Sequence, residues 1–438
     1  MAASTSPDLH KLVIYSVFVR NHTPEGTFRA VIPDLPRIRS LGADVVWLMP
    51  IHPIGKIARK GSLGSPYANR DYRSVNPELG TLDDFRALVD AIHAEGMRCI
   101  IDVVYNHTSP DSVLWETHPE WFYLREDGTP GNHVGDWSDI IDLDYHLPAS
   151  TAEGGLWDYQ VQSLVGWAHI VDGFRCDVAS FVPVEFWKRA RAACEEVRPG
   201  CIWLAETVHR SFGDEMRRQS LYCATDSQQF EAFDLEYAYD VQEAFDRFVE
   251  APDAPARVSA LSHWLDLVDL QENAYPAGFN KLRFLENHDL PRIAGRIGAG
   301  GLDLEALTAM LFFLKGATLL YAGQEAAAEH VPTLFDRDTI SWETGRDLSG
   351  LISRLAQIKH ERMEARDAFG ARVSEQGCVV MERIREDARL FGAFPVCGTH
   401  DMVEVRAADG SYENLVDGAP VEVRDGSLLC DRPVIISL

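Results

Sequence analysis

The chain has 438 residues, of which 46% are hydrophobic and 25% charged, a composition typical of a globular protein with a sizeable core. Its formal net charge of −26 at pH 7 argues against nucleic acids and anionic membranes as partners, because an acidic surface repels phosphate groups. Neutral substrates such as sugars are not excluded.

The first residues, MAASTSPDLHKL, lack the basic and apolar regions of a secretory signal. The longest apolar stretch, residues 309–322, is interrupted by Lys315 and Gly316 and is too short to span a membrane. The cysteines form no CxxC pair: Cys99, Cys176, Cys194, Cys201, Cys223, Cys378, Cys397 and Cys430. We therefore expect a cytoplasmic protein with free, buried thiols.

Short apolar runs alternate with amphipathic stretches over most of the chain. The runs predict strands at residues 12–19, 43–50, 97–106, 171–179, 201–207, 230–237, 281–289 and 317–325. Residues 81–96 are typical of the helices between them, because Thr81 can cap the first turn and Gly96 can end the last. Eight strands that alternate with helices predict an α/β fold, a parallel (β/α)8 TIM barrel.

Two segments depart from this alternation. Residues 106–147 are rich in Trp, Asp, Gly and Pro, and they predict a short domain inserted after the third strand. Alternating β runs with Gly and Asp turns predict a small all-β, sandwich-like domain over residues 367–438. The barrel is then expected to comprise residues 1–105 and 148–366.

Carboxylates follow four of the predicted strands, where barrel enzymes carry their catalytic groups. They are Asp102, Asp177, Glu206 and Asp289. Arg175 lies two residues before Asp177, so both side chains leave the same face of a strand, and the guanidinium favours an ionised carboxylate. Glu206 follows the apolar run Ile-Trp-Leu-Ala, which favours a raised pKa. An ionised nucleophile beside a protonated acid is the pair that retaining glycosidases use.

Several short motifs together resemble those of glycoside hydrolase family 13, the α-amylase family. They are DVVYNH at residues 102–107, GFRCD at 173–177, the glutamate of WLAET, and FLENHD at 284–289. IIDLDY, GSPYANRDYRSVNPELGT and LLYAGQE are also similar to family segments, and the resemblance extends from about residue 15 to 358. It implies a (β/α)8 catalytic domain with the inserted segment as domain B.

The resemblance also implies roles for individual residues. Asp177 becomes the nucleophile, Glu206 the acid/base, and Asp289 the third carboxylate, which binds sugar hydroxyls. Substrate binding or its support is implied for Tyr67, Asp102, His107, Arg175 and His288. No cofactor is expected to be required.

Three features leave details open. Residues 178–181 read Val-Ala-Ser-Phe, whereas many family members have Lys-His after the nucleophile, so the leaving-side specificity is not assigned. Asn106 corresponds to a calcium ligand of classical amylases, and the alternative is a hydrogen bond that braces domain B. Domain B has six aromatic residues, of which we expect two to contact substrate and the others to form a local core: Trp115, Trp121, Phe122, Tyr123, Trp137 and Tyr145.

The leading functional hypothesis is hydrolysis of α-1,4-glucosidic bonds in maltodextrins and similar oligosaccharides. An exo-acting α-glucosidase and a transglycosylase use the same residues and are alternatives. A non-catalytic sugar-binding relative is a third alternative. The joint presence of three carboxylates, Arg175 and both histidines argues against that third alternative.

Overall fold

The computed structural model describes residues 2, 5–135, 137–297, 301–386 and 388–438. Within these ranges eight parallel strands close into a barrel in the order β1-β10-β9-β8-β7-β6-β3-β2. The barrel strands are β1 (Val13–Val17), β2 (Val45–Leu48), β3 (Arg98–Val103), β6 (Gly173–Cys176), β7 (Ile202–Ala205), β8 (Leu235–Tyr237), β9 (Lys281–Arg283) and β10 (Ala317–Tyr321). Each lies inside one of the predicted runs, so the predicted TIM barrel is confirmed.

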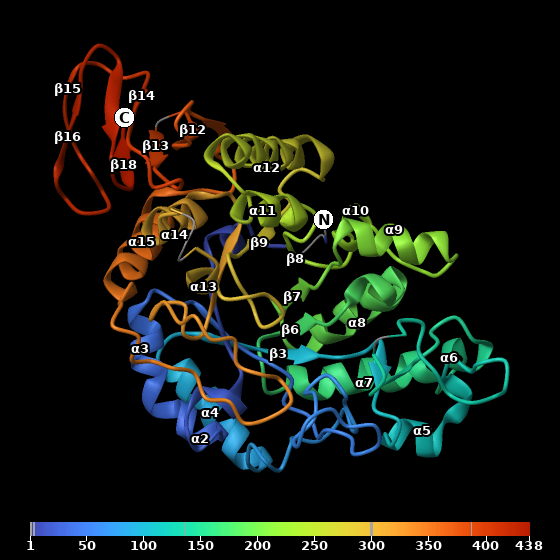
Figure 1. Cartoon of the computed structure of the whole chain (residues 1–438). Coiled ribbons are helices and arrows are strands. Elements are labelled where there is room, and N and C mark those ends of the chain that lie inside the picture. Colours follow the sequence, from blue (N-terminus) through green and yellow to red (C-terminus); the bar gives the residue numbers. More distant parts are fainter. Residues whose placement is uncertain (1, 3–4, 136, 298–300, 387) are drawn as a thin grey trace.

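Helices surround the barrel on its outside (Figure 1). They are α1 (Val19–His22), α2 (Phe28–Val31), α3 (Leu35–Ser40), α4 (Leu82–Ala94), α7 (Leu156–Ala168), α8 (Val184–Val197), α9 (Arg210–Arg218), α10 (Asp226–Gln229), α11 (Gln242–Val249), α12 (Ala254–Ala274), α13 (Ile293–Ile297), α14 (Leu304–Phe313) and α15 (Ser349–Arg362), with 3-10 turns η1 (Pro7–Lys11), η2 (Ile32–Asp34) and η4 (Ala179–Phe181). The prediction for α4 is confirmed. Thr81 and Asp84 cap its first turn reciprocally, and Gly96 follows its last turn with a φ of 75°.

The segment inserted after β3 forms a small lobe at one side of the barrel mouth. It contains β4 (His107–Thr108), α5 (Val113–Thr117), η3 (Pro119–Trp121), β5 (Ile141–Asp142) and α6 (Pro148–Thr151). Strands β4 and β5 are antiparallel, and His107 is the direct partner of Asp142. The lobe therefore fixes the backbone of His107, the last residue of the DVVYNH motif.

After α15 the chain forms only β structure, as predicted. Its strands are β11 (Ala368–Val373), β12 (Val379–Arg385), β13 (Ala388–Phe394), β14 (Asp401–Glu404), β15 (Gly410–Glu413), β16 (Pro420–Val423), β17 (Ser427–Cys430) and β18 (Val434–Ser437). They form the sheet β11-β12-β13-β18 and two antiparallel pairs, β14-β17 and β15-β16, around a hydrophobic core of their own. This part packs beside α12 and α14 (Figure 1), where the guanidinium of Arg383 donates a hydrogen bond to the carbonyl of Phe313.

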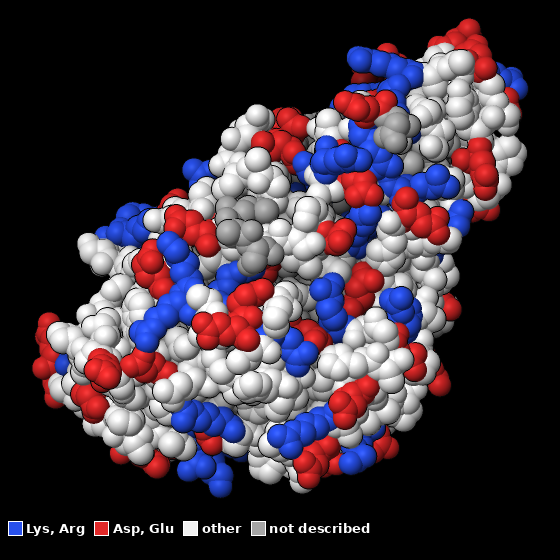
Figure 2. Space-filling model, turned by 180° about the vertical axis from the view of Figure 1, so that it is seen from behind, with Lys and Arg blue, Asp and Glu red and all other residues white. Residues whose placement is uncertain are grey.

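All eight cysteines are free, and all but Cys397 are buried, as expected. None of the helices in the described ranges combines the length and the apolar composition needed to cross a membrane. On the face seen in Figure 2, basic side chains lie among acidic ones over most of the surface. This mixed pattern does not form the single basic stripe that is typical of nucleic-acid binding.

Candidate active site

Neighbouring strands bring the predicted carboxylates to one end of the barrel. Asp102 on β3 is the direct cross-strand partner of Arg175 on β6. Asp177 follows β6 and donates its backbone N–H to the carbonyl of Val103, at 2.9 Å. Glu206 follows β7 and donates its N–H to the carbonyl of Cys176, at 3.0 Å. The ladder of the barrel therefore sets the positions of all three carboxylates.

The guanidinium of Arg175 contacts these three carboxylates at once. Its Nη1 donates to Asp102 Oδ1 at 2.9 Å and to Asp177 Oδ1 at 2.8 Å, and its Nη2 forms an ion pair with Glu206 Oε1 at 2.7 Å. The guanidinium is fully buried. It lies over three aromatic rings at 5.3–5.7 Å, those of Trp47, Tyr67 and Tyr237. The contact with Asp177 was predicted, whereas those with Asp102 and Glu206 were not.

Glu206 has a second partner that its sequence neighbours do not reveal. The backbone N–H of Val178 donates to Glu206 Oε2 at 2.7 Å. Val178 has a φ of 35° and a ψ of 45°, in the left-handed region that β-branched residues rarely adopt. Burial raises the pKa of Glu206 well above its usual range, although Arg175 and the Val178 N–H oppose this effect. The raised pKa favours the protonated form that a general acid needs.

The remaining predicted residues meet beside this carboxylate group. The hydroxyl of Tyr67 donates to Asp102 Oδ2 at 3.1 Å and lies 2.7 Å from His288 Nε2, and the two rings stack at 5.3 Å. His288 Nε2 lies 3.2 Å from Asp289 Oδ2, and His107 Nε2 lies 3.9 Å from Asp177 Oδ2. Burial lowers the pKa of both histidines, which favours their neutral forms.

These groups border a cavity of about 380 Å³ at the mouth of the barrel. Its lining contains the predicted residues Tyr67, His107, Asp177, Glu206, His288 and Asp289. Asp102 and Arg175 are fully buried beneath it and do not belong to the lining. The side chain of Asp289 is 46% exposed, so the cavity opens to solvent on its side.

Sequence reasoning missed several lining residues, among them Lys60, His209, Phe212, Tyr239 and Phe335. Tyr239 could have been found, because it lies two residues beyond Tyr237 at the end of β8, on the same face. Phe212 lies in α9, and the others lie on loops and carry no periodic signal. Of the six aromatic residues of domain B, Trp137 alone lines this cavity, where we expected two. Trp121, Phe122 and Tyr145 are buried in the core, as expected for most of the set.

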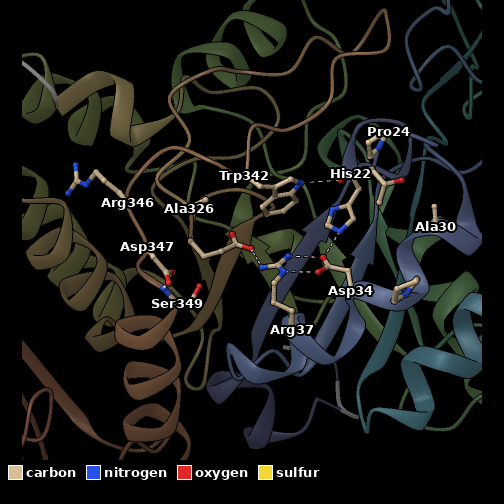
Figure 3. Close-up of a pocket in the computed structure, with 13 residues that line it drawn as sticks. His22, Pro24, Ala30, Asp34, Arg37, Ala326, Trp342, Arg346, Asp347 and Ser349 are labelled. Atoms are coloured by element: carbon tan, nitrogen blue, oxygen red, sulfur yellow. Dashed lines mark hydrogen bonds and ion pairs between the residues drawn. The ribbon is translucent and has the colours of Figure 1, made fainter.

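A larger cavity, of about 630 Å³, lies outside the mouth between α3 and α15. Figure 3 shows Arg37 between Asp34 and the carboxylate that follows β10, with His22 and Trp342 above them. Every carboxylate in its lining already accepts a hydrogen bond: Asp34 from Arg37, Glu325 from Arg37 and Tyr15, and Asp347 from the Ser349 N–H. We assign the chemistry to the smaller cavity, because Asp177, Glu206 and Asp289 line it together.

Asn106 lies between β3 and β4, at the start of domain B. The side-chain nitrogen of Asn106 lies 3.2 Å from Nδ1 of its neighbour His107, and its backbone carbonyl accepts from the N–H of Leu143 in domain B at 3.0 Å. Within the described ranges, no three His, Cys, Asp or Glu side chains are grouped so that they could hold a metal ion. Calcium takes about six to eight oxygen ligands. Calcium binding at Asn106 stays a prediction.

Comparison with known proteins adds independent information. The family model described as alpha amylase, catalytic domain, matches residues 13–137 and 138–375, and that of the bacterial alpha amylase C-terminal domain matches residues 371–436. The crystal structure of an alpha-amylase from Lactobacillus plantarum is 42% identical in sequence. It aligns over 99% of this chain and 100% of that one, with a TM-score of 0.92.

Two curated relatives are longer proteins. Alpha-amylase MalA of Haloarcula japonica is 27% identical over 365 residues, which are 80% of this chain and 49% of the relative. An alpha-1,4-glucan:maltose-1-phosphate maltosyltransferase of Rhodospirillum rubrum is 39% identical over 203 residues, which are 42% of this chain and 29% of the relative. The chain thus spans about half or less of the length of these relatives.

Proposed function

Because the chain belongs to the α-amylase family and is a glycosidase, we propose that it hydrolyses α-1,4-glucosidic bonds of maltodextrins with retention of configuration. The observation that carries the proposal is the contact of one guanidinium, that of Arg175, with both Asp177 and Glu206. Retaining enzymes hold their two carboxyl groups about 5–5.5 Å apart. A shared guanidinium holds the pair at close range on one side of a cavity.

In the first step, a carboxylate oxygen of Asp177 forms a bond to the anomeric carbon while the bond from that carbon to the glycosidic oxygen breaks. Glu206 gives its proton to the departing oxygen, which leaves as a hydroxyl group. Arg175 donates a hydrogen bond to the attacking carboxylate of Asp177, and burial raises the pKa of Glu206, which favours its protonated form. The product of this step is a covalent glycosyl-enzyme.

In the second step, Glu206 takes a proton from water, whose oxygen attacks the anomeric carbon and displaces Asp177. Two inversions at one carbon leave the configuration unchanged. Asp289 and the neutral imidazoles of His107 and His288 border the same cavity and are placed to hydrogen-bond sugar hydroxyls. We propose that Asp102 acts from beneath, because its contacts are with Arg175 and Tyr67.

The test is proton NMR of the first products released from maltoheptaose. We expect the α anomer before mutarotation, and release of the β anomer would contradict retention. Asp177→Asn should abolish turnover while oligosaccharide binding, measured by calorimetry, persists. Asp347→Asn is the matched control, because it makes the same change outside the cavity.

Transfer of the glycosyl group to a second sugar is the other function that a specific observation favours. The cavity wall next to Glu206 is apolar, with Val178, Val208 and Phe212 in its lining. An apolar wall suits the faces of a sugar acceptor better than it suits water. One curated relative is itself a maltosyltransferase. Products longer than the substrate, formed when maltotriose is added in excess, would establish transfer.

A further inference from the structure

Hydrogen bonds join two loops from distant parts of the sequence at the barrel mouth. The N–H groups of Leu63 and Gly64 donate to the carbonyl of Phe335 at 3.0 and 3.1 Å. The backbone N–H of Ser62 donates to Asp336 Oδ1 at 2.8 Å. We call residues 60–65 and 334–336 the wall. Its two halves act as one surface because these hydrogen bonds join them.

Buried Arg20, in α1 just after β1, binds both halves of the wall. Its Nη1 donates to the carbonyls of Gly64 and Leu334, both at 3.0 Å. Lys60 forms an ion pair with Asp139 of domain B at 3.0 Å, which extends the wall toward β3. Lys60, Leu334 and Phe335 also line the catalytic cavity, so the wall is one of its sides.

The strand order places the wall relative to the catalytic pair. In the barrel, β1 lies between β2 and β10, and β7 is the strand directly across from β1. The halves of the wall follow β2 and β10 and are held by Arg20 after β1, whereas Glu206 follows β7. The wall therefore faces Glu206 across the mouth.

This placement has a consequence for the substrate if Glu206 protonates the leaving oxygen, as proposed above. The leaving sugar then lies on the β7 side, and the glycone extends away from Glu206 toward the wall. The cavity of about 380 Å³ is near the lower end of the range of about 300–1,000 Å³ for ligand pockets. We infer that the wall closes the glycone side, so that the enzyme works from the non-reducing end and releases a mono- or disaccharide.

The experiment compares two forms of maltoheptaose that carry a fluorescent label at the reducing end. One has a free non-reducing end, and the other carries a 4,6-O-benzylidene group on that terminal sugar. We expect the free chain to lose one or two sugars in each turnover. The blocked chain should react about 100-fold more slowly, because the added group keeps the scissile bond out of its reacting position. Equal rates, or labelled fragments of every length from the first turnovers, would overturn the inference.

The same assay separates this inference from the proposed function on which it rests. If the enzyme cleaves neither chain nor an aryl α-maltoside, the proposed function fails and the inference fails with it. If the blocked chain is cleaved at the rate of the free chain, hydrolysis stands and only the closed wall is refuted.

Variants of the wall provide a second measurement. Phe335→Ala removes a side chain from the cavity lining, and Asp336→Ala removes the acceptor for Ser62 outside it. Both should speed cleavage of the blocked chain at least about tenfold relative to the free chain and should lengthen the first products. Asp347→Ala is the control, because Asp347 makes a similar loop hydrogen bond, to Ser349, away from the mouth. An unchanged product pattern in folded wall variants would refute the role of the wall.

Discussion

Replacing Asp142 with asparagine should stabilise the protein at alkaline pH and not at acidic pH. Asp142 is 5% exposed, and it accepts one hydrogen bond, from the His133 N–H at 2.8 Å, while its Oδ1 has no partner. Burial raises the pKa of Asp142 from 3.8 to about 7. The folded state therefore holds a proton that the unfolded state releases between about pH 4 and pH 7.

The sign follows from proton linkage. Because the folded state binds more protons in this window, the free energy of unfolding falls as the pH rises from about 4 to about 7, and it is then constant. The difference between the two pKa values corresponds to a loss of about 4 kcal/mol in the free energy of unfolding, at about 1.36 kcal/mol for each pKa unit. This is an upper limit, because Asp142 lines a cavity of about 350 Å³ that water can enter.

The assay is thermal unfolding of the wild type and Asp142→Asn at several pH values between 5 and 8.5, with EDTA present throughout. We expect the Tm of the variant to exceed that of the wild type least at pH 5, and by several degrees above pH 7.5. Asp144→Asn removes a carboxylate from the same cavity and is the control. A Tm difference that does not depend on pH would refute the raised pKa of Asp142. A raised pKa in the folded state requires the difference to grow as the pH rises.

Three further predictions concern activity. Glu206→Gln should lose far more rate on maltodextrins than on aryl α-glucosides with good leaving groups, and an equal loss on both would exclude a role as general acid. Tyr67→Phe removes a hydroxyl that contacts Asp102 and His288 but keeps the stacked ring, so kcat/KM should fall about 10–100-fold, as for a lost bond to a charged group. Dialysis against EDTA should leave kcat unchanged within the error of the assay. A loss of activity that calcium alone restores would show that the enzyme requires calcium.

Much of the fold could be predicted from local patterns, because each barrel strand is a short apolar run and helices such as α4 and α12 begin at capping residues. The carboxylates could be located for a related reason. A residue that follows a parallel strand of a barrel lies at the mouth whatever the details of packing are. Asp177 and Glu206, each the first residue after its strand, illustrate this rule.

The contacts among those residues could not be predicted in the same way. The bond from Arg175 to Asp102 depends on the register between β3 and β6, and its ion pair with Glu206 depends on the register between β6 and β7. The wall joins Ser62 to Asp336 through loops that have no periodic pattern. The left-handed conformation of Val178 has no local signal either, because glycine or asparagine is the usual residue there.

The backbone of Val178 offers a practical route to altered enzymes. The N–H of Val178 donates a hydrogen bond to Glu206, while its side chain belongs to the apolar part of the cavity lining. Saturation mutagenesis here should therefore change acceptor preference and leave the donor to the general acid intact. Proline is the exception, because it has no N–H and cannot adopt a positive φ. Glycine and asparagine accept this conformation at lower cost, which makes them suitable first substitutions in such a library.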